Sequence, residues 1–252
     1  MEKLNSKQIK IVQAETLQQL SQKTLELFVD AVHQTLKKQD VFYLAISGGR
    51  TPADFYKLLG TDRRSLDLPW SRIELFWVDE RCVGPDSPDS NFKLAADTFL
   101  NAVAIPKQNI HRIAGEYPDY LQTVQEYTET LQKVFKIEEW EVPAFDLMIL
   151  GMGPDGHIGS LLPDSYDFDR NTLVSEVYHK TGGYNRITLT HPVICNSQKI
   201  LVLVSGSEKA EMLKTAFTTK PNEIKYPVHT LWPFLKKVVW LIDSDAAKEL
   251  SN

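Results

Sequence analysis

A carboxylate and an imidazole, separated by one residue, stand in the glycine-rich segment at residues 151–163 of this chain. The segment reads Gly-Met-Gly-Pro-Asp-Gly-His-Ile-Gly-Ser-Leu-Leu-Pro, with the titratable side chains at Asp155 and His157. It follows an almost wholly apolar run at 145–150, which predicts a buried strand. Glycines permit a sharp turn or a close approach to a ligand, and an imidazole can accept a proton near neutral pH. This arrangement predicts proton-transfer chemistry at the end of a core strand.

Three glycines of the same segment, Gly151, Gly153 and Gly156, also fit the dinucleotide fingerprint G-x-G-x-x-G. That fingerprint requires a helix to begin at once, because the amino end of the helix holds the pyrophosphate. Here Pro163 follows within two turns and Pro154 crowds the loop. We therefore expect no dinucleotide and no other cofactor. Taken by itself, the segment also fits a structural turn with a satisfied histidine.

A second glycine-containing turn, at residues 47–52, lies between the strand predicted at 41–46 and the helix predicted at 52–59. Pro52 suits the first helical position, and Thr51 suits the cap before it. The glycines leave backbone amides free to face a ligand, and the positive end of the helix favours an anion. The turn is too short for a P-loop and lacks its lysine, so it fits a sugar phosphate or a purely structural turn. Its candidate binding residues are Ser47, Gly48, Gly49 and Thr51.

Three cations stand at other strand boundaries. Arg81 follows Asp79 and Glu80 at the end of the strand predicted at 73–78, where the charges could also form a solvated rim. Its guanidinium offers a rigid fork for oxyanions. Ser207 is the expected cap of a helix at 208–217, which places Lys209 in the first turn. A cation there opposes the helix dipole, which favours an accompanying anion.

The third cation, Arg186, precedes a strand-like segment at 187–190. Strands alternating with helices predict an α/β fold with an open, mostly parallel sheet flanked by helices. Ligands of such sheets bind outside the carboxyl ends of the strands. The remaining predicted strands are at 199–204 and 238–242, and the remaining predicted helices at 16–38, 91–100 and 120–135.

The composition of the chain excludes several classes of protein. Its 252 residues show no linker or repeat, which predicts one domain over 1–252. A net charge of −5 argues against a nucleic-acid partner. No apolar run approaches a membrane span, and residues 1–7 lack the apolar core of a signal peptide. Cys82 and Cys195 lack C-x-x-C spacing, which suggests free thiols and a cytoplasmic location.

The other histidines show no metal-binding spacing, so no metal site is expected. A G-x-S-x-G motif is missing as well, which disfavours a serine hydrolase.

Together these segments resemble the 6-phosphogluconolactonases. The matching pieces lie in the expected order and span most of the chain, at residues 47–52, 77–83, 85–92, 151–163, 186–190 and 205–210. The resemblance implies a sugar-phosphate lactone as substrate, hydrolysed in the oxidative pentose phosphate pathway without metal or cofactor. It implies that His157 is the base, that Asp155 orients it or contacts substrate, and that Arg81 stabilises the oxyanion.

In the same scheme Arg186, Lys209 and the turn at 47–51 hold the phosphate. The approach to Arg186 at 179–185 departs from the proline-rich pattern of the family, which leaves the role of this arginine the least defined.

Two alternatives remain open at this point. Glucosamine-6-phosphate deaminases resemble this chain up to the Gly-His-Ile at 156–158 but continue with Ala-Phe-Asn-Glu-Pro, and they have a tyrosine where Arg81 stands. A non-catalytic sugar-phosphate sensor would keep the cations without needing Asp155 and His157, because a fold does not fix a function.

Overall fold

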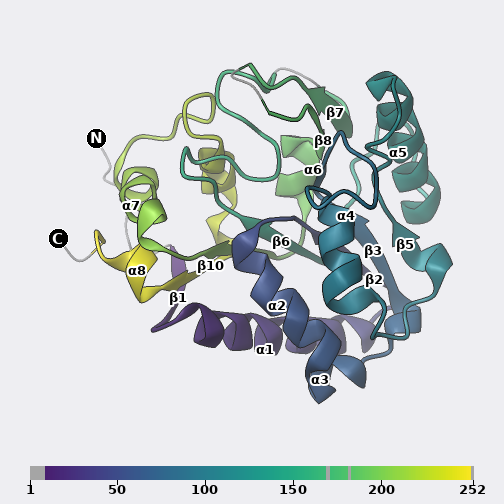
Figure 1. Ribbon diagram of the computed structural model, residues 1–252, viewed down its shortest axis with the longest axis horizontal. Helices are drawn as coiled ribbons and strands as arrows, with labels where there is room; N and C mark the ends of the chain where they lie inside the picture. The colour runs from purple at the N-terminus through teal and green to yellow at the C-terminus, as the bar shows by residue number, and fades with distance from the viewer. Residues whose placement is uncertain (1–8, 169–170, 181–182, 251–252) are drawn as a thin grey trace.

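A seven-stranded parallel sheet forms the centre of the molecule (Figure 1). The computed structural model describes residues 9–168, 171–180 and 183–250, so the segment at 1–7 lies outside the described residues. The strand order is β1-β10-β9-β6-β2-β3-β5, and every adjacent pair runs parallel. The strands are β1 (Lys10–Ala14), β2 (Phe42–Ile46), β3 (Ile73–Trp77), β5 (Ile110–His111), β6 (Leu147–Gly151), β9 (Ile200–Val204) and β10 (Val238–Asp243). The predicted open parallel sheet is confirmed.

The central strands are buried along nearly their whole length, which is why their sequences are continuous apolar runs. The edge strand β1 is mostly exposed or half-buried, and its mixed sequence carried no clear strand signal.

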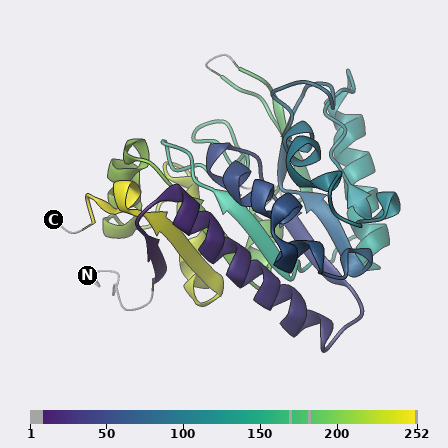
Figure 2. The same ribbon diagram turned by 60° about the horizontal axis from the view of Figure 1, so that its bottom comes forward.

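Helices cover both faces of the sheet, and α1 packs against α2 on one of them (Figure 2). Helix α1 begins after Thr16, whose side-chain oxygen accepts a hydrogen bond from the Gln19 amide. The helices are α1 (Leu17–Leu36), α2 (Arg50–Thr61), α3 (Arg63–Leu66), α4 (Asn91–Ala95), α5 (Tyr120–Phe135), α6 (His191–Asn196), α7 (Ala210–Thr218) and α8 (Ser244–Ala247). Within the described residues, none of them is both long and apolar enough to cross a membrane.

The helix predicted at 91–100 is divided, because α4 continues as a π-helical turn over Ala96–Leu100. The described residues also form four 3-10 segments, of which three are short and one spans 11 residues. They are η2 (Trp70–Arg72), η4 (Lys107–Asn109), η5 (Ser207–Lys209) and η6 (Pro227–Lys237).

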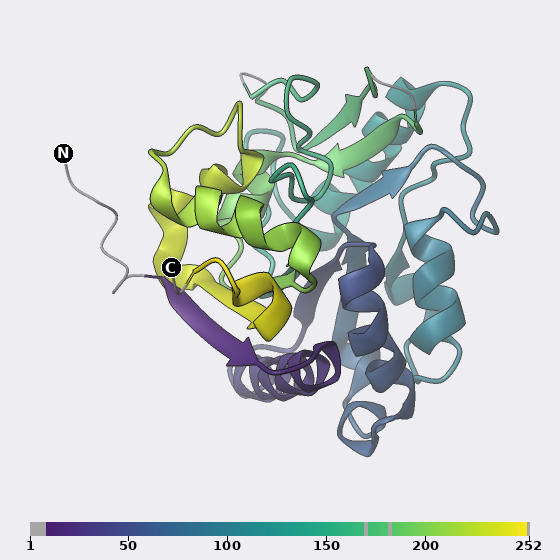
Figure 3. The ribbon, with the colours of Figure 1, turned by 60° about the vertical axis from the view of Figure 1, so that its left-hand side comes forward.

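A second, antiparallel sheet of three short strands was not predicted. It has the order β4-β8-β7, with β4 (Asp79–Arg81), β8 (Arg186–Leu189) and β7 (Val174–Val177). Figure 3 shows it on the opposite side of the molecule from β1, and β7 packs against α5. One continuous cluster of buried apolar side chains includes residues of both sheets. The small sheet therefore extends the main core and holds β4 just beyond the end of β3.

The strand order reverses between β2 and β6, because successive strands are added toward one edge of the sheet after β2 and toward the other edge after β6. From β2 the sheet extends through β3 to β5, whereas from β6 it extends through β9 and β10 to β1. In open α/β sheets the crevice at such a reversal, beyond the carboxyl ends of the strands, is where ligands bind. The turns at 47–52 and 151–163 follow β2 and β6, so both glycine-rich segments lie at this crevice.

Candidate active site

Asp155 and His157 form a hydrogen-bonded pair in the loop after β6. Asp155 Oδ1 lies 2.6 Å from His157 Nδ1 and also accepts the His157 backbone N–H at 3.2 Å. The loop closes through the Gly153 N–H, which donates to the His157 carbonyl at 2.8 Å. A Cβ at Gly153 would lie 2.2 Å from the imidazole ring, so only glycine leaves room for it. In the loop, Gly156 takes a φ of +85°.

The charge on Asp155 sets the tautomer of the imidazole. Burial by itself raises the pKa of Asp155, but the hydrogen bonds and charge of His157 outweigh it and lower this pKa to about 2. Asp155 is therefore ionised at neutral pH and accepts the proton on Nδ1 of His157. A neutral ring held in this way carries its free lone pair on Nε2. The geometry supplies a proton acceptor at Nε2 and a fixed carboxylate behind it.

We expect an NMR titration of the Asp155 carboxyl to give a pKa of about 2 in the parent protein. In a His157→Ala variant this pKa should rise, because the largest stabilising contacts of the carboxylate are lost. Since the folded pKa lies below the usual 3.8, the pair stabilises the fold fully above about pH 4, and this is lost as pH falls toward 2. An unchanged pKa in His157→Ala would contradict the assigned pairing.

Two helix starts face the same space without a side-chain cap. Helix α2 begins after Gly49 (φ +110°) and η5, which leads into α7, begins after Gly206 (φ +96°). Neither glycine has a side chain to cap a backbone amide, which leaves the start of α2 suited to an anion, whereas in η5 the Lys209 N–H donates to the Gly206 carbonyl at 3.1 Å. The predicted caps, Thr51 and Ser207, are therefore wrong, since each lies inside its helix. A Cβ at Gly48 would overlap the side chain of Asn91, so Gly48 makes room for that amide.

Arg81 and Arg186 lie directly opposite each other on β4 and β8. Arg186 Nη1 lies 3.8 Å from Asp79 Oδ2, and Arg81 Nη1 donates to the Asp89 carbonyl at 2.5 Å. Like charges at directly opposed strand positions destabilise the pairing. An anion bound between or beside the two guanidinium groups would relieve this repulsion.

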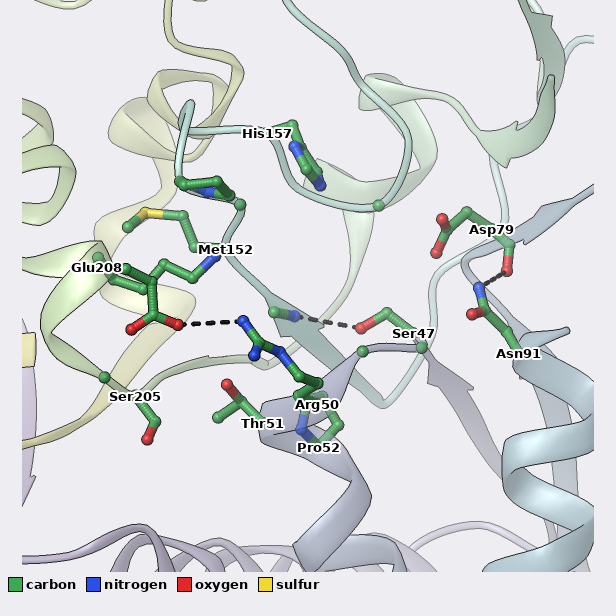
Figure 4. A pocket seen from close by; sticks show the side chains of 18 of the residues that line it. Ser47, Arg50, Thr51, Pro52, Asp79, Asn91, Met152, His157, Ser205 and Glu208 are labelled. Atoms are coloured by element: carbon green, nitrogen blue, oxygen red, sulfur yellow. Dashed lines mark hydrogen bonds and ion pairs between the residues drawn. The ribbon is translucent and has the colours of Figure 1, made fainter. Parts of the chain in front are cut away.

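A cleft of about 490 Å³ brings these elements together (Figure 4). Of the predicted site residues, all but Asp155 line it, namely Ser47, Gly48, Gly49, Thr51, Arg81, His157, Arg186 and Lys209. Asp155 supports the imidazole without lining the cleft itself. Burial lowers the pKa of Lys209, while the carboxylates of Glu208 and Asp155 act in the opposite direction. The ammonium of Lys209 and the carboxylate of Asp155 therefore interact electrostatically.

Several residues in the cleft or next to it were not predicted as site residues. Asp79 and Glu80 are buried, with 4% and 2% of their surface exposed, which makes the solvated rim wrong. Asp79 accepts a hydrogen bond from Ser160 and lines the cleft together with Asn91. The three consecutive charged residues at 79–81 were the sequence feature that could have pointed to these site residues. A run of charges, however, does not show which of its side chains are buried.

Ser47 connects the loops on the two sides of the crevice. Its hydroxyl accepts the Gly151 N–H at 3.2 Å, and its own N–H donates to the Ile149 carbonyl at 3.1 Å. The buried Tyr56 hydroxyl of α2 donates to the Ser47 carbonyl at 2.5 Å. The start of α2 is thereby fixed relative to β6 and to the loop that carries His157.

The chain belongs to the family described as glucosamine-6-phosphate isomerases/6-phosphogluconolactonase, which matches residues 15–240. Within that family, it is 34% identical over 229 residues to a 6-phosphogluconolactonase of Nostoc sp., covering 91% of this chain and 93% of the relative. A 6-phosphogluconolactonase of Synechocystis sp. is 36% identical over 82% of this chain and 84% of its own length. The crystal structure of a 6-phosphogluconolactonase from Thermotoga maritima is 26% identical, with a TM-score of 0.76 over 93% of this chain and 99% of that one.

Proposed function

We propose that this protein hydrolyses 6-phospho-D-glucono-1,5-lactone to 6-phospho-D-gluconate in the oxidative pentose phosphate pathway. The observation that carries the proposal is the Asp155–His157 pair, which presents Nε2 of the ring to a cleft lined by uncapped helix starts and three predicted cations. A lactone ester and a phosphate are the two groups such a cleft is suited to receive. The relatives named 6-phosphogluconolactonase support the same substrate.

In the proposed reaction, His157 Nε2 takes a proton from water, and the water oxygen attacks the lactone carbonyl carbon. The tetrahedral intermediate carries an oxyanion, which Arg81 stabilises. When the intermediate collapses, the bond from C1 to the ring oxygen breaks, and the imidazolium returns its proton to that oxygen. Asp155 stays ionised and stabilises the imidazolium. A general base supplies about 10²–10⁴-fold and one oxyanion donor about 10²–10³-fold.

The phosphate is held in this scheme by Arg186, Lys209 and the turn at 47–51. In the 1,5-lactone, C1 and C5 flank the same ring oxygen, so the carbonyl and the phosphate on C6 are only a few bonds apart. Neighbouring arginines, such as the cross-strand partners Arg81 and Arg186, can then serve the two groups of one substrate. Arginine suits both because its planar fork matches oxyanions.

The loop after His157 favours a lactonase over a deaminase. Where the deaminase pattern has Asn-Glu before the proline, this chain has Leu161 and Leu162, which are 0% and 6% exposed. Buried leucines cannot supply the carboxylate found there in the deaminase pattern. Ser160 is also buried and donates to Asp79 at 2.7 Å, a hydrogen bond that the phenylalanine of the deaminase pattern could not make.

The purified protein should consume 6-phospho-D-glucono-1,5-lactone well above its spontaneous hydrolysis at neutral pH, with a chelator present throughout. It should release no ammonia from glucosamine 6-phosphate. Ammonia release would favour the deaminase, and binding of sugar phosphates without turnover would favour a sensor. A rate that collapses on adding chelator would contradict a metal-free reaction.

We also propose that the reaction takes place in the cytoplasm and involves no nucleic-acid partner. The location is supported by the two cysteines, Cys82 and Cys195, which are both free thiols. The net charge of −5 supports the second point.

A further inference from the structure

An ion pair joins the two helix starts at the cleft. Arg50 is the first residue of α2, Glu208 belongs to η5, and both line the cleft. Arg50 Nη2 lies 3.3 Å from Glu208 Oε1 (Figure 4). The two side chains are 92% and 51% exposed, so the pair stands in solvent. The mechanism above gives neither side chain a role, although Arg50 belongs to the turn at 47–51.

Arg50 occupies an unfavourable place for a cation. It stands in the first turn of α2, where the partial charge of the helix is positive, and Gly49 contributes no side-chain cap. Lys209, at the start of the facing helix, adds a further positive charge. These positive charges repel one another, so a nearby anion is stabilising. In this structure the anion is the Glu208 carboxylate.

The carboxylate of Glu208 lies over the start of its own helix. A Cβ at Gly206 would come within 2.4 Å of Glu208 Oε2, so the carboxylate fills the space above this glycine. It thus contacts the start of η5 while pairing with the start of α2. This is the region where the proposed function places the phosphate of the substrate.

We propose that Arg50 is a further phosphate-binding residue, and that Glu208 competes with the phosphate of the substrate for it. The proposal rests on the proposed function, which supplies the phosphate. Exposed ion pairs are weak and readily exchanged, whereas a guanidinium binds phosphate through two parallel hydrogen bonds. An arriving dianion repels the Glu208 carboxylate, which turns away and releases Arg50 to the phosphate. Arg50 then contributes to the preference for phosphorylated over unphosphorylated lactones.

Substitutions at the two residues should shift the KM for the phosphorylated lactone in opposite directions. Arg50→Ala should raise it about tenfold, because a charge-assisted hydrogen bond to the phosphate is lost. Glu208→Gln should lower it about threefold, because the competing charge is removed while the shape of the side chain is kept. In both variants kcat should change less than KM. The inhibition constant of inorganic phosphate, used as a competitive inhibitor, should follow KM.

A second exposed ion pair, away from the cleft, provides a matched control. Arg63 and Asp67 form an ion pair of 3.2 Å with side chains 89% and 66% exposed, and neither residue lines the cleft. Arg63→Ala and Asp67→Asn should leave KM unchanged. Unphosphorylated glucono-1,5-lactone provides a second control, since its kcat/KM should be the same in the parent, Arg50→Ala and Glu208→Gln.

The outcomes separate this proposal from the proposed function. Shifts of KM in the same direction for both variants, or an unchanged KM in Arg50→Ala, would overturn the role of Arg50 while leaving the lactonase in place. Equal losses on the unphosphorylated lactone would overturn it as well. If the parent protein does not hydrolyse the lactone, the proposed function fails. Phosphate binding that weakens in Arg50→Ala, measured by calorimetry, would then still support the anion site.

Discussion

A His157→Ala variant should lose about 10²–10⁴-fold in kcat for the phosphorylated lactone, because the general base is gone. The rate is to be measured after subtracting spontaneous hydrolysis of the lactone, which otherwise hides the loss. Substrate binding should be largely kept, since the cations and helix starts that receive the phosphate remain. The expected signature is therefore a fall in kcat with a KM close to that of the parent.

The fold should tolerate this substitution, because the His157 side chain is 25% exposed and, among the described residues, its ring pairs with Asp155. Circular dichroism and the thermal midpoint check that the variant remains folded. His33→Ala, at an exposed position near the end of α1, is the matched histidine control and should keep full activity. A His157→Ala protein with near-parent turnover would refute the assignment of the base.

A Glu80→Ala variant should lose about 3–5 kcal/mol of unfolding free energy, because one buried carboxylate binds four donors. Glu80 accepts hydrogen bonds from the backbone amides of Arg81, Asn91 and Phe92 and from the Ser90 hydroxyl, at 2.7–2.9 Å. Burial raises the pKa of Glu80, and these hydrogen bonds oppose that rise. Without the carboxylate, residues 90–92 lose three hydrogen bonds to β4, and the bonds from Arg81 to the Asp89 carbonyl and from Asn91 to the Asp79 carbonyl remain.

Urea denaturation measures this loss, with Glu80→Gln as the conservative comparison. The glutamine keeps the shape of the side chain and one carbonyl acceptor, so it should lose clearly less stability than the alanine. Glu129→Ala, on the exposed face of α5, should change the unfolding free energy by less than about 0.5 kcal/mol. If Glu80→Ala is as stable as Glu129→Ala, the loop is held by other contacts.

The parallel sheet could be predicted because its strands carry their own signal. β6, β9 and β10 are buried on both faces, so their sequences are continuous apolar runs that need no partner to be recognised. β4 has three charged residues, Asp79 to Arg81, and is a strand only because β8 pairs with it from over 100 residues away. Such pairing leaves no local trace in the sequence. The extent of a single domain over 1–252 stays a prediction.

In the candidate site too, contacts within one loop could be predicted from the sequence, whereas contacts between distant segments could not. Asp155 and His157 are close in sequence, so their pairing could be expected from the loop alone, although not which nitrogen faces the carboxylate. The opposition of Arg81 and Arg186 and the pairing of Arg50 with Glu208 join distant segments. The use of glycine rather than Thr51 or Ser207 before the helices depends on backbone angles that composition does not reveal.

The bond between the Ser47 hydroxyl and the Gly151 amide spans 104 residues, and the cleft also draws on the ends of β3 and β9. A fragment that lacks either half of the sheet therefore cannot form this cleft. During refolding, secondary structure should return early, whereas turnover should reappear last, after the slow long-range strand pairings are complete. Enzyme activity therefore reports that folding is complete in this protein. Proteolytic cleavage between β2 and β6 that lets the two halves separate should abolish the activity.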